Sequence, residues 1–124
     1  MNLILSALIG LAPLAAQAAA PAPSPSLPRL SPQNTALVRC AAAFALVAYD
    51  QENGGDTARK WPSIDPRGRE FFVRALAQVM DETGMDREAV AGMVEGEARS
   101  LLDQGQVDQV MPACLLMLDA SGIE

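Results

Sequence analysis

The hydrophobic pattern of the chain is dominated by residues 36–49, A-L-V-R-C-A-A-A-F-A-L-V-A-Y, where every residue except Arg39 is apolar. A helix that is apolar on nearly all sides is enclosed either by a bilayer or by neighbouring helices. These fourteen residues span only about 21 Å at ~1.5 Å per residue, whereas a bilayer core is ~30 Å thick. We therefore predict that they form the central helix of a small bundle.

Both ends of this central helix carry residues that favour helix capping. Ser31 can accept a hydrogen bond from a free backbone N–H, and Pro32 suits the first helical position because its missing N–H would be unpaired there. The sequence Asn53-Gly54-Gly55 is a typical stop signal. We therefore expect the helix to end near Glu52.

The loop over residues 53–64 contains K-W-P at 60–62 and the chain's only tryptophan. Trp61 could be an exposed recognition residue, or it could fold back as a lid on one end of the bundle. We expect the lid, because an indole ring covers a large apolar area while its N–H can still reach a partner.

Three further amphipathic helices are expected, over about 66–83, 87–104 and 107–120. Asp65 and Asp86 are the candidate caps of the first two, with Pro66 first inside its helix. Pro112 falls inside the last pattern, so either that helix kinks or a short turn precedes a helix that begins near Met111. The connections are short, which favours antiparallel neighbours. The predicted fold is an all-α, small antiparallel four-helix bundle over residues 32–124.

The N-terminal segment has the pattern of a targeting signal. Residues 1–20, MNLILSALIGLAPLAAQAAA, combine an apolar run with a small-x-small ending, which predicts a secretory signal peptide cleaved near Ala18 or Ala20. A retained membrane anchor is the alternative, although Pro13 breaks the run and no Lys or Arg precedes it. Residues 21–31 hold four prolines and predict an extended linker, or else a ligand for a partner domain. We expect a periplasmic or secreted protein without stable membrane insertion after cleavage.

Composition narrows the range of functions. The 124 residues suit one domain, and the formal charge of −6 argues against binding to nucleic acid or to anionic lipid. The chain has no histidine, which excludes imidazole metal sites and Ser-His or Cys-His catalysis. We predict no cofactor, no metal and no catalytic residue.

The two cysteines, Cys40 and Cys114, each lie in the middle of an inward-facing stripe. An even cysteine count in an exported protein predicts a disulfide. Closing a loop of this length could stabilise the fold by roughly 4 kcal/mol. A redox-active pair is the alternative, but it usually has C-x-x-C spacing. We expect a structural disulfide.

Glu97 interrupts an apolar stripe, because it lies seven residues after Val90. A carboxylate there could act as an acid or base or bind a cationic ligand. The simpler interpretation, which we favour, is a buried polar site in which Glu97 pairs with Arg69 or Arg39. Three arginines, Arg67, Arg69 and Arg74, lie near the start of the helix expected over 66–83. They could bind an anion at that helix start, or they could form a solvated helix face.

Three short motifs, C-A-A-A-F-A at 40–45, G-R-E-F-F-V at 68–73 and M-P-A-C-L at 111–115, resemble small exported bacterial helical proteins that have two cysteines and no assigned activity. This resemblance covers about residues 36–122 and implies a shared fold but no reaction. A looser similarity is to the two-cysteine acid-stress chaperones of the periplasm.

The function that these features favour is an exported, non-enzymatic helical interaction module of the bacterial envelope, with an envelope protein as its partner. Two alternatives stay open. One is a small periplasmic hydrolase that uses a carboxylate such as Glu97. The other is a chaperone-like holdase of acid stress. The sequence leaves the oligomeric state open.

Overall fold

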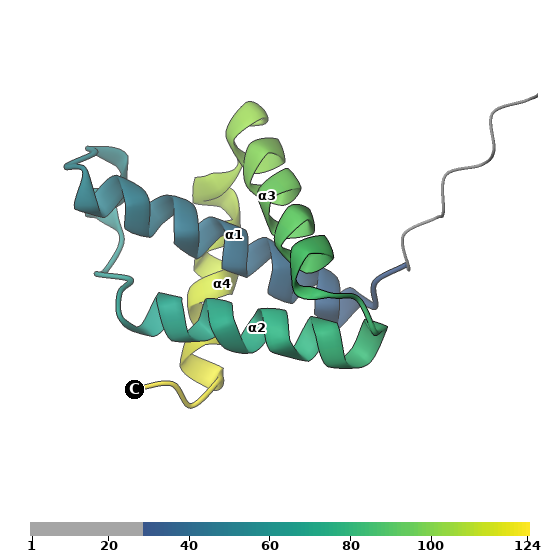
Figure 1. Cartoon of the computed structure of the whole chain (residues 1–124). Helices are drawn as coiled ribbons and strands as arrows, with labels where there is room; N and C mark the ends of the chain where they lie inside the picture. Colours follow the sequence, from purple (N-terminus) through teal and green to yellow (C-terminus); the bar gives the residue numbers. More distant parts are fainter. Residues whose placement is uncertain (1–28) are drawn as a thin grey trace, which may run out of the picture.

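The computed structural model describes residues 29–124 and is all-α over that range (Figure 1). Its elements are α1 (Pro32–Glu52), the 3-10 helix η1 (Thr57–Lys60), α2 (Arg67–Thr83), α3 (Arg87–Asp103) and α4 (Val107–Ala120). The predicted fold class is thus confirmed. The predicted signal peptide, and the predicted linker up to residue 28, lie outside the described residues.

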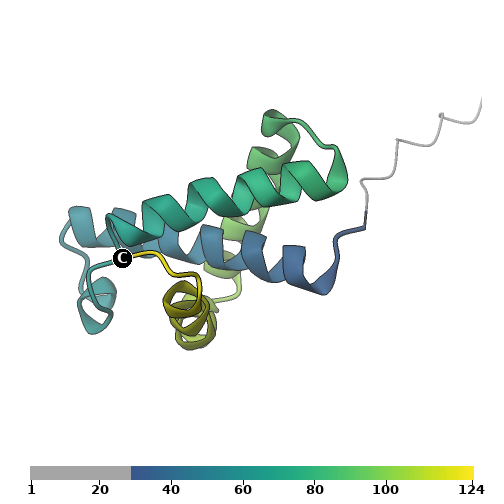
Figure 2. The same cartoon turned by 90° about the horizontal axis from the view of Figure 1, so that it is seen from below.

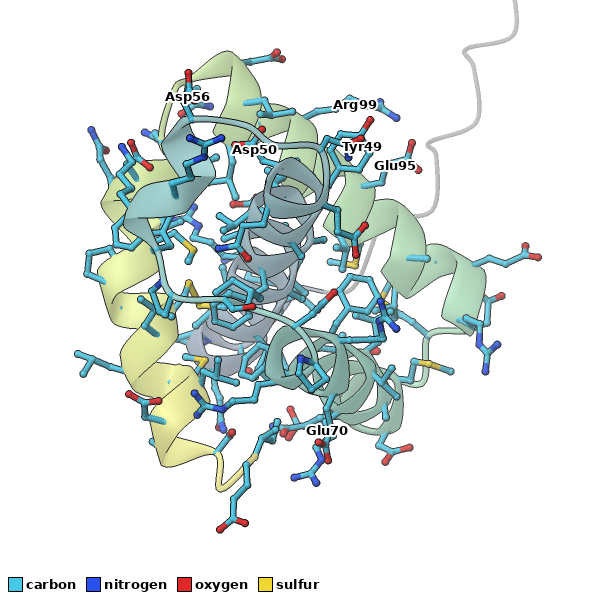
Figure 3. All side chains as sticks on the ribbon, turned by 90° about the vertical axis from the view of Figure 1, so that its left-hand side faces the viewer. Tyr49, Asp50, Asp56, Glu70, Glu95 and Arg99 are labelled. Atoms are coloured by element: carbon cyan, nitrogen blue, oxygen red, sulfur yellow. A yellow bond between two sulfur atoms is a disulfide. The ribbon has the colours of Figure 1, made fainter. Side chains whose placement is uncertain are left out.

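α1 occupies the centre of the bundle and packs against α2, α3, α4 and η1. α2 runs back along α1, whereas α3 and α4 cross it and run in opposite directions (Figure 1). The view from below shows α4 nearly end-on beside α1 (Figure 2). Looking along α1, α3 and α4 lie on opposite sides of it (Figure 3). This arrangement explains why residues 36–49 are apolar on almost every side.

The core is built around the small residues of α1. Ala41, Ala42 and Ala43 have 0 % exposure, so neighbouring helices approach the backbone of α1 closely here. Next to them, the rings of Phe44 and Phe71 meet edge to face, with centroids 5.2 Å apart and planes at 84°. This geometry is the favoured one for an aromatic pair, and it joins α1 to α2.

Two of the three expected helix caps are confirmed. The Ser31 hydroxyl accepts a hydrogen bond from the Asn34 N–H at 3.1 Å, and the Asp86 carboxylate accepts one from the Ala89 N–H at 2.8 Å. These bonds satisfy donors that have no partner within the helix.

The predicted start of α2 is wrong by one residue. α2 begins at Arg67, Pro66 occupies the cap position, and the Asp65 side chain pairs with Arg69 at 3.4 Å. A backbone hydrogen bond takes the place of a side-chain cap in the first turn of α2, because the Gly68 N–H donates to the Ile64 carbonyl at 2.8 Å. Ile64 is buried and fixes this turn, so no side-chain cap is required.

α4 is continuous from Val107 to Ala120, so it does not restart at Met111. Pro112 is exposed and lies in the second turn. Its missing N–H therefore removes one intrahelical hydrogen bond close to the helix start.

The predicted disulfide between Cys40 and Cys114 is confirmed, with the two Cα atoms 5.2 Å apart. Both cysteines are buried, and the bond joins the middle of α1 to the middle of α4. Within residues 29–124 no helix has the length and apolarity needed to cross a membrane.

Candidate functional site

An open groove of about 490 Å³ lies at the end of the bundle where α1 finishes. Four elements contribute to it: the last turns of α1, Trp61 from the connection to α2, the end of α3 and the start of α4. Figure 3 looks at this end of the molecule, where Tyr49 and Asp50 lie at the end of α1. The groove is thus a meeting point of segments that are far apart in the sequence.

The groove is mainly apolar. Val47 and Leu101 form its buried floor, and the half-buried Trp61 stands at its wall. At its rim Tyr49 and Leu102 are 68 % and 59 % exposed, which is unusual for such large apolar side chains. Exposed apolar residues that converge on one concavity are typical of a binding surface, whereas isolated ones need no explanation.

Trp61 is held in place by a polar residue of α1. The Gln51 side-chain amide donates hydrogen bonds to the carbonyls of Trp61 and Pro62, at 3.4 and 3.0 Å. Its oxygen accepts from the Ile64 N–H at 3.0 Å. Trp61 folds back against the core, as predicted for the lid. It stands as one wall of the groove and leaves the groove open.

Asp108, at the start of α4, holds the other side of Trp61. One carboxylate oxygen accepts from the Trp61 Nε1–H at 3.2 Å, and the other is ion-paired with Lys60. The hydrogen bond from Lys60 holds the pKa of Asp108 below its ordinary value, with a smaller contribution from Trp61. Asp108 therefore stays ionised at neutral pH, and the carboxylate links the loop to α4.

The groove end of the molecule is acidic. Segments 49–61 and 99–108 together carry five carboxylates and three basic side chains. Each of the three basic side chains already has a carboxylate partner: Arg59 pairs with Asp56, Lys60 with Asp108, and Arg99 with Glu95. Figure 3 shows Asp56, Glu95 and Arg99 around the end of α1.

Two carboxylates at this end remain without such a partner. Glu52 and Asp103 are exposed, and neither forms an ion pair with any described residue. They follow the groove residues Asp50 and Leu102 closely in the sequence. A cationic group bound near this end of the bundle would therefore meet carboxylates that pair with no basic side chain among the described residues.

The predicted polar site around Glu97 is only partly assembled. Glu97 forms an ion pair with Arg39 at 2.9 Å, across α3 and α1, and its side chain is 25 % exposed. Arg69, the other expected partner, lies elsewhere and pairs with Asp65, beside a small cavity of about 210 Å³ between α1 and α2. Neither Glu97 nor Arg39 lines the groove.

The arginines of α2 are each engaged by other groups. Arg67 donates to the Ile123 carbonyl and to the Asp119 carboxylate, both at 3.0 Å. Arg74 forms an ion pair with Glu70, the i,i+4 partner expected for a solvated helix face. An anion at this helix start would have to compete with these carboxylates. The described residues also contain no cluster of three or more His, Cys, Asp or Glu that could hold a metal ion.

Sequence patterns alone did not identify the residues that shape the groove. In the sequence, Tyr49 stands out only as the last apolar residue of the central helix. Gln51 and Asp108 bond to residues that are 10 and 47 positions away from them, and such pairings leave no periodic trace. Trp61 is the one feature of the sequence that points to this end of the bundle.

Comparisons of the chain with models of known protein families, with curated proteins and with solved structures find no match.

Proposed function

We propose that this protein is an exported, non-enzymatic interaction module of the bacterial envelope, which binds an envelope protein through the groove. The observation that carries the proposal is the convergence of Tyr49 and Leu102, both strongly exposed, on an apolar concavity next to Trp61. Leaving such side chains in water lowers the stability gained from apolar burial, and a partner that covers them recovers it.

Export is supported by two independent features. The first is the signal-like pattern of residues 1–20. The second is the disulfide, because such bonds form and persist in oxidising compartments and are rare in the cytosol.

Export is tested by intact mass measurement of the protein recovered from a bacterial envelope fraction, with and without reductant and thiol alkylation. We expect a chain that begins near residue 19 or 21 and that resists alkylation until it is reduced. A full-length chain with two free thiols would contradict export.

The interaction role is tested by crosslinking in the envelope. A photo-reactive side chain at position 102 lies at the groove rim, whereas one at position 116 replaces a leucine of α4 that is even more exposed but lies outside the groove. We expect one discrete adduct at 102 and none at 116. Equal adducts at both positions would indicate nonspecific contact.

A hydrolase based on Glu97 receives no support from the geometry, because Arg39 already binds that carboxylate and Glu97 lines neither of the two cavities described above. A Glu97→Gln variant is the decisive probe. We expect it to fold and to keep its groove crosslink. Loss of a hydrolytic activity in that variant alone would revive the enzyme hypothesis.

The acid-stress holdase is a second candidate, because an acid-sensitive carboxylate fixes the groove wall. Protonation of Asp108 would release Lys60 and Trp61, and the apolar floor at Val47 and Leu101 would become more accessible. At about pH 2–3 such a protein should loosen and suppress the aggregation of a model client. A protein that stays compact and fails to suppress aggregation there would remove this candidate.

A further inference from the structure

We infer that the groove binds a short amphipathic segment of a partner polypeptide, in which an apolar side chain is flanked by lysine or arginine. This inference rests on the proposed interaction function and specifies the chemistry of its partner. It is argued from the shape of the groove, from its charge and from the way its wall is fixed.

The shape of the groove favours a side chain carried by a passing chain. Its volume of about 490 Å³ lies in the usual range of ligand sites, ~300–1,000 Å³. The groove is open, and its most exposed apolar groups, Tyr49 and Leu102, lie at the rim and not at the floor. A segment that lies across the rim can cover both residues while one of its own apolar side chains reaches Val47 and Leu101.

The charge of the groove selects the residues that flank this apolar side chain. Arg59, Lys60 and Arg99 are already paired, whereas Glu52 and Asp103 are not. A lysine or arginine on the partner can pair with either carboxylate, and an acidic segment would be repelled. The net charge of −6 is carried entirely by residues 29–124, so the rest of the molecule adds to this preference and also repels anionic lipid.

The fixed wall favours affinity. Trp61 is held by Gln51 from one side and by Asp108 from the other, so little ordering of the loop is needed on binding. Trp61 is also the only tryptophan of the chain, and its emission therefore reports on the groove alone.

The experiment titrates the oxidised, purified protein with three synthetic peptides of about eighteen residues, a length at which isolated helices can form. All three lack tryptophan and tyrosine. The first combines leucine and lysine on opposite helix faces, the second replaces lysine with glutamate, and the third replaces leucine with serine. We expect a saturable change in Trp61 emission with the first peptide only. Added salt should lower the affinity of that peptide severalfold, because it screens the charge interaction.

Two matched variants locate the binding site. Leu102→Ser removes an apolar contact at the rim without changing its charge, and we expect binding of the leucine–lysine peptide to weaken by roughly tenfold. Leu116→Ser makes the same change at a leucine that is 71 % exposed outside the groove. We expect that variant to bind within about twofold of the unchanged protein. Because both leucines are exposed, circular dichroism should show unchanged folding.

Each other outcome overturns the inference in a defined way. Equal binding of the glutamate peptide would refute the charge argument, and equal binding of the serine peptide would indicate mere electrostatic adhesion. Equal saturation by hexylamine would make the occupant a small amine. A dimer of the protein alone that Leu102→Ser dissociates would make the occupant a second copy. No emission change with any peptide would refute the inference outright.

The crosslink at position 102 separates this inference from the proposed function. An adduct in the envelope without peptide binding would leave the interaction module intact and refute the chemistry of its partner. Peptide binding without an adduct would support the groove chemistry and contradict the envelope role.

Discussion

Replacing Cys40 and Cys114 with alanine removes the covalent link between α1 and α4. The cysteines are 74 residues apart, and a crosslink of that span lowers the entropy of the unfolded chain by an amount worth about 4 kcal/mol at 25 °C. A domain of this size has a total stability of roughly 5–14 kcal/mol, so the loss is a large fraction of it.

The expected loss converts into a clear shift of the unfolding midpoint. At roughly 4–8 °C per kcal/mol for small domains, the double variant should melt about 15–30 °C below the oxidised protein. The assay is thermal and urea unfolding followed by circular dichroism, at matched protein concentration. Because both sulfur atoms are buried, the alanines also leave small cavities, which add to the loss.

Reduced wild-type protein is the matched control, because it lacks the bond but keeps both sulfur atoms in the core. We expect most of the loss to appear already in this reduced protein. A difference below about 1 kcal/mol between the oxidised and reduced forms would refute the argument from unfolded-chain entropy. It would mean that the non-covalent contacts of α4 are enough to hold it in place.

Two further predictions concern the loop and the start of α2. A Cβ at position 68 would lie 2.1 Å from the Cγ2 of buried Ile64, so Gly68→Ala should lower the free energy of unfolding by ~1–3 kcal/mol. Gly92→Ala, on an open helical surface, should raise the free energy of unfolding by ~1 kcal/mol. If both variants changed the free energy of unfolding in the same direction, the close contact between position 68 and Ile64 would be contradicted. The second prediction concerns pH. The pKa of Asp108 is lowered by folding, so its contribution to stability is present above about pH 4 and is lost as the pH falls through the lowered pKa. Trp61 emission should shift over that acid range, and an identical shift in Asp108→Asn would show that another group is responsible.

The parts of this fold that could be predicted are those governed by local pattern. The limits of α1 follow from Ser31 and from the glycines after Glu52, and the disulfide follows from two cysteines on inward stripes. The cap of α2 was mispredicted because a tertiary contact, the burial of Ile64, organises that turn instead of the Asp65 side chain. Tertiary packing routinely overrides a local preference of this kind.

The candidate site was less predictable, for a geometric reason. Helix periodicity shows that Glu97 lies on an apolar face of its helix. Whether Glu97 pairs with Arg39 or with Arg69 depends on which helix packs against α3 near Glu97, and periodicity does not determine that. The groove depends on four segments that meet at one end of the bundle. Pairings such as Lys60 with Asp108 join residues 48 positions apart, and only the fold brings them together.

The fully covered alanines of α1 determine how the protein can respond to a partner. Successive helical residues point about 100° apart, so three covered residues in a row mean contact around most of the helix circumference. A slide of α1 by one turn in one direction would move Arg39 into the place of Ala43, and a slide in the other direction would move Val47 there. Neither larger side chain fits a site packed around alanine, so α1 has no second packed position. Binding of a ligand in the groove is therefore not expected to shift α1 along its axis. The connection that carries Trp61 is also held, by Gln51 and Asp108, so we expect the protein to bind its partner as a rigid body and to act only by forming the complex.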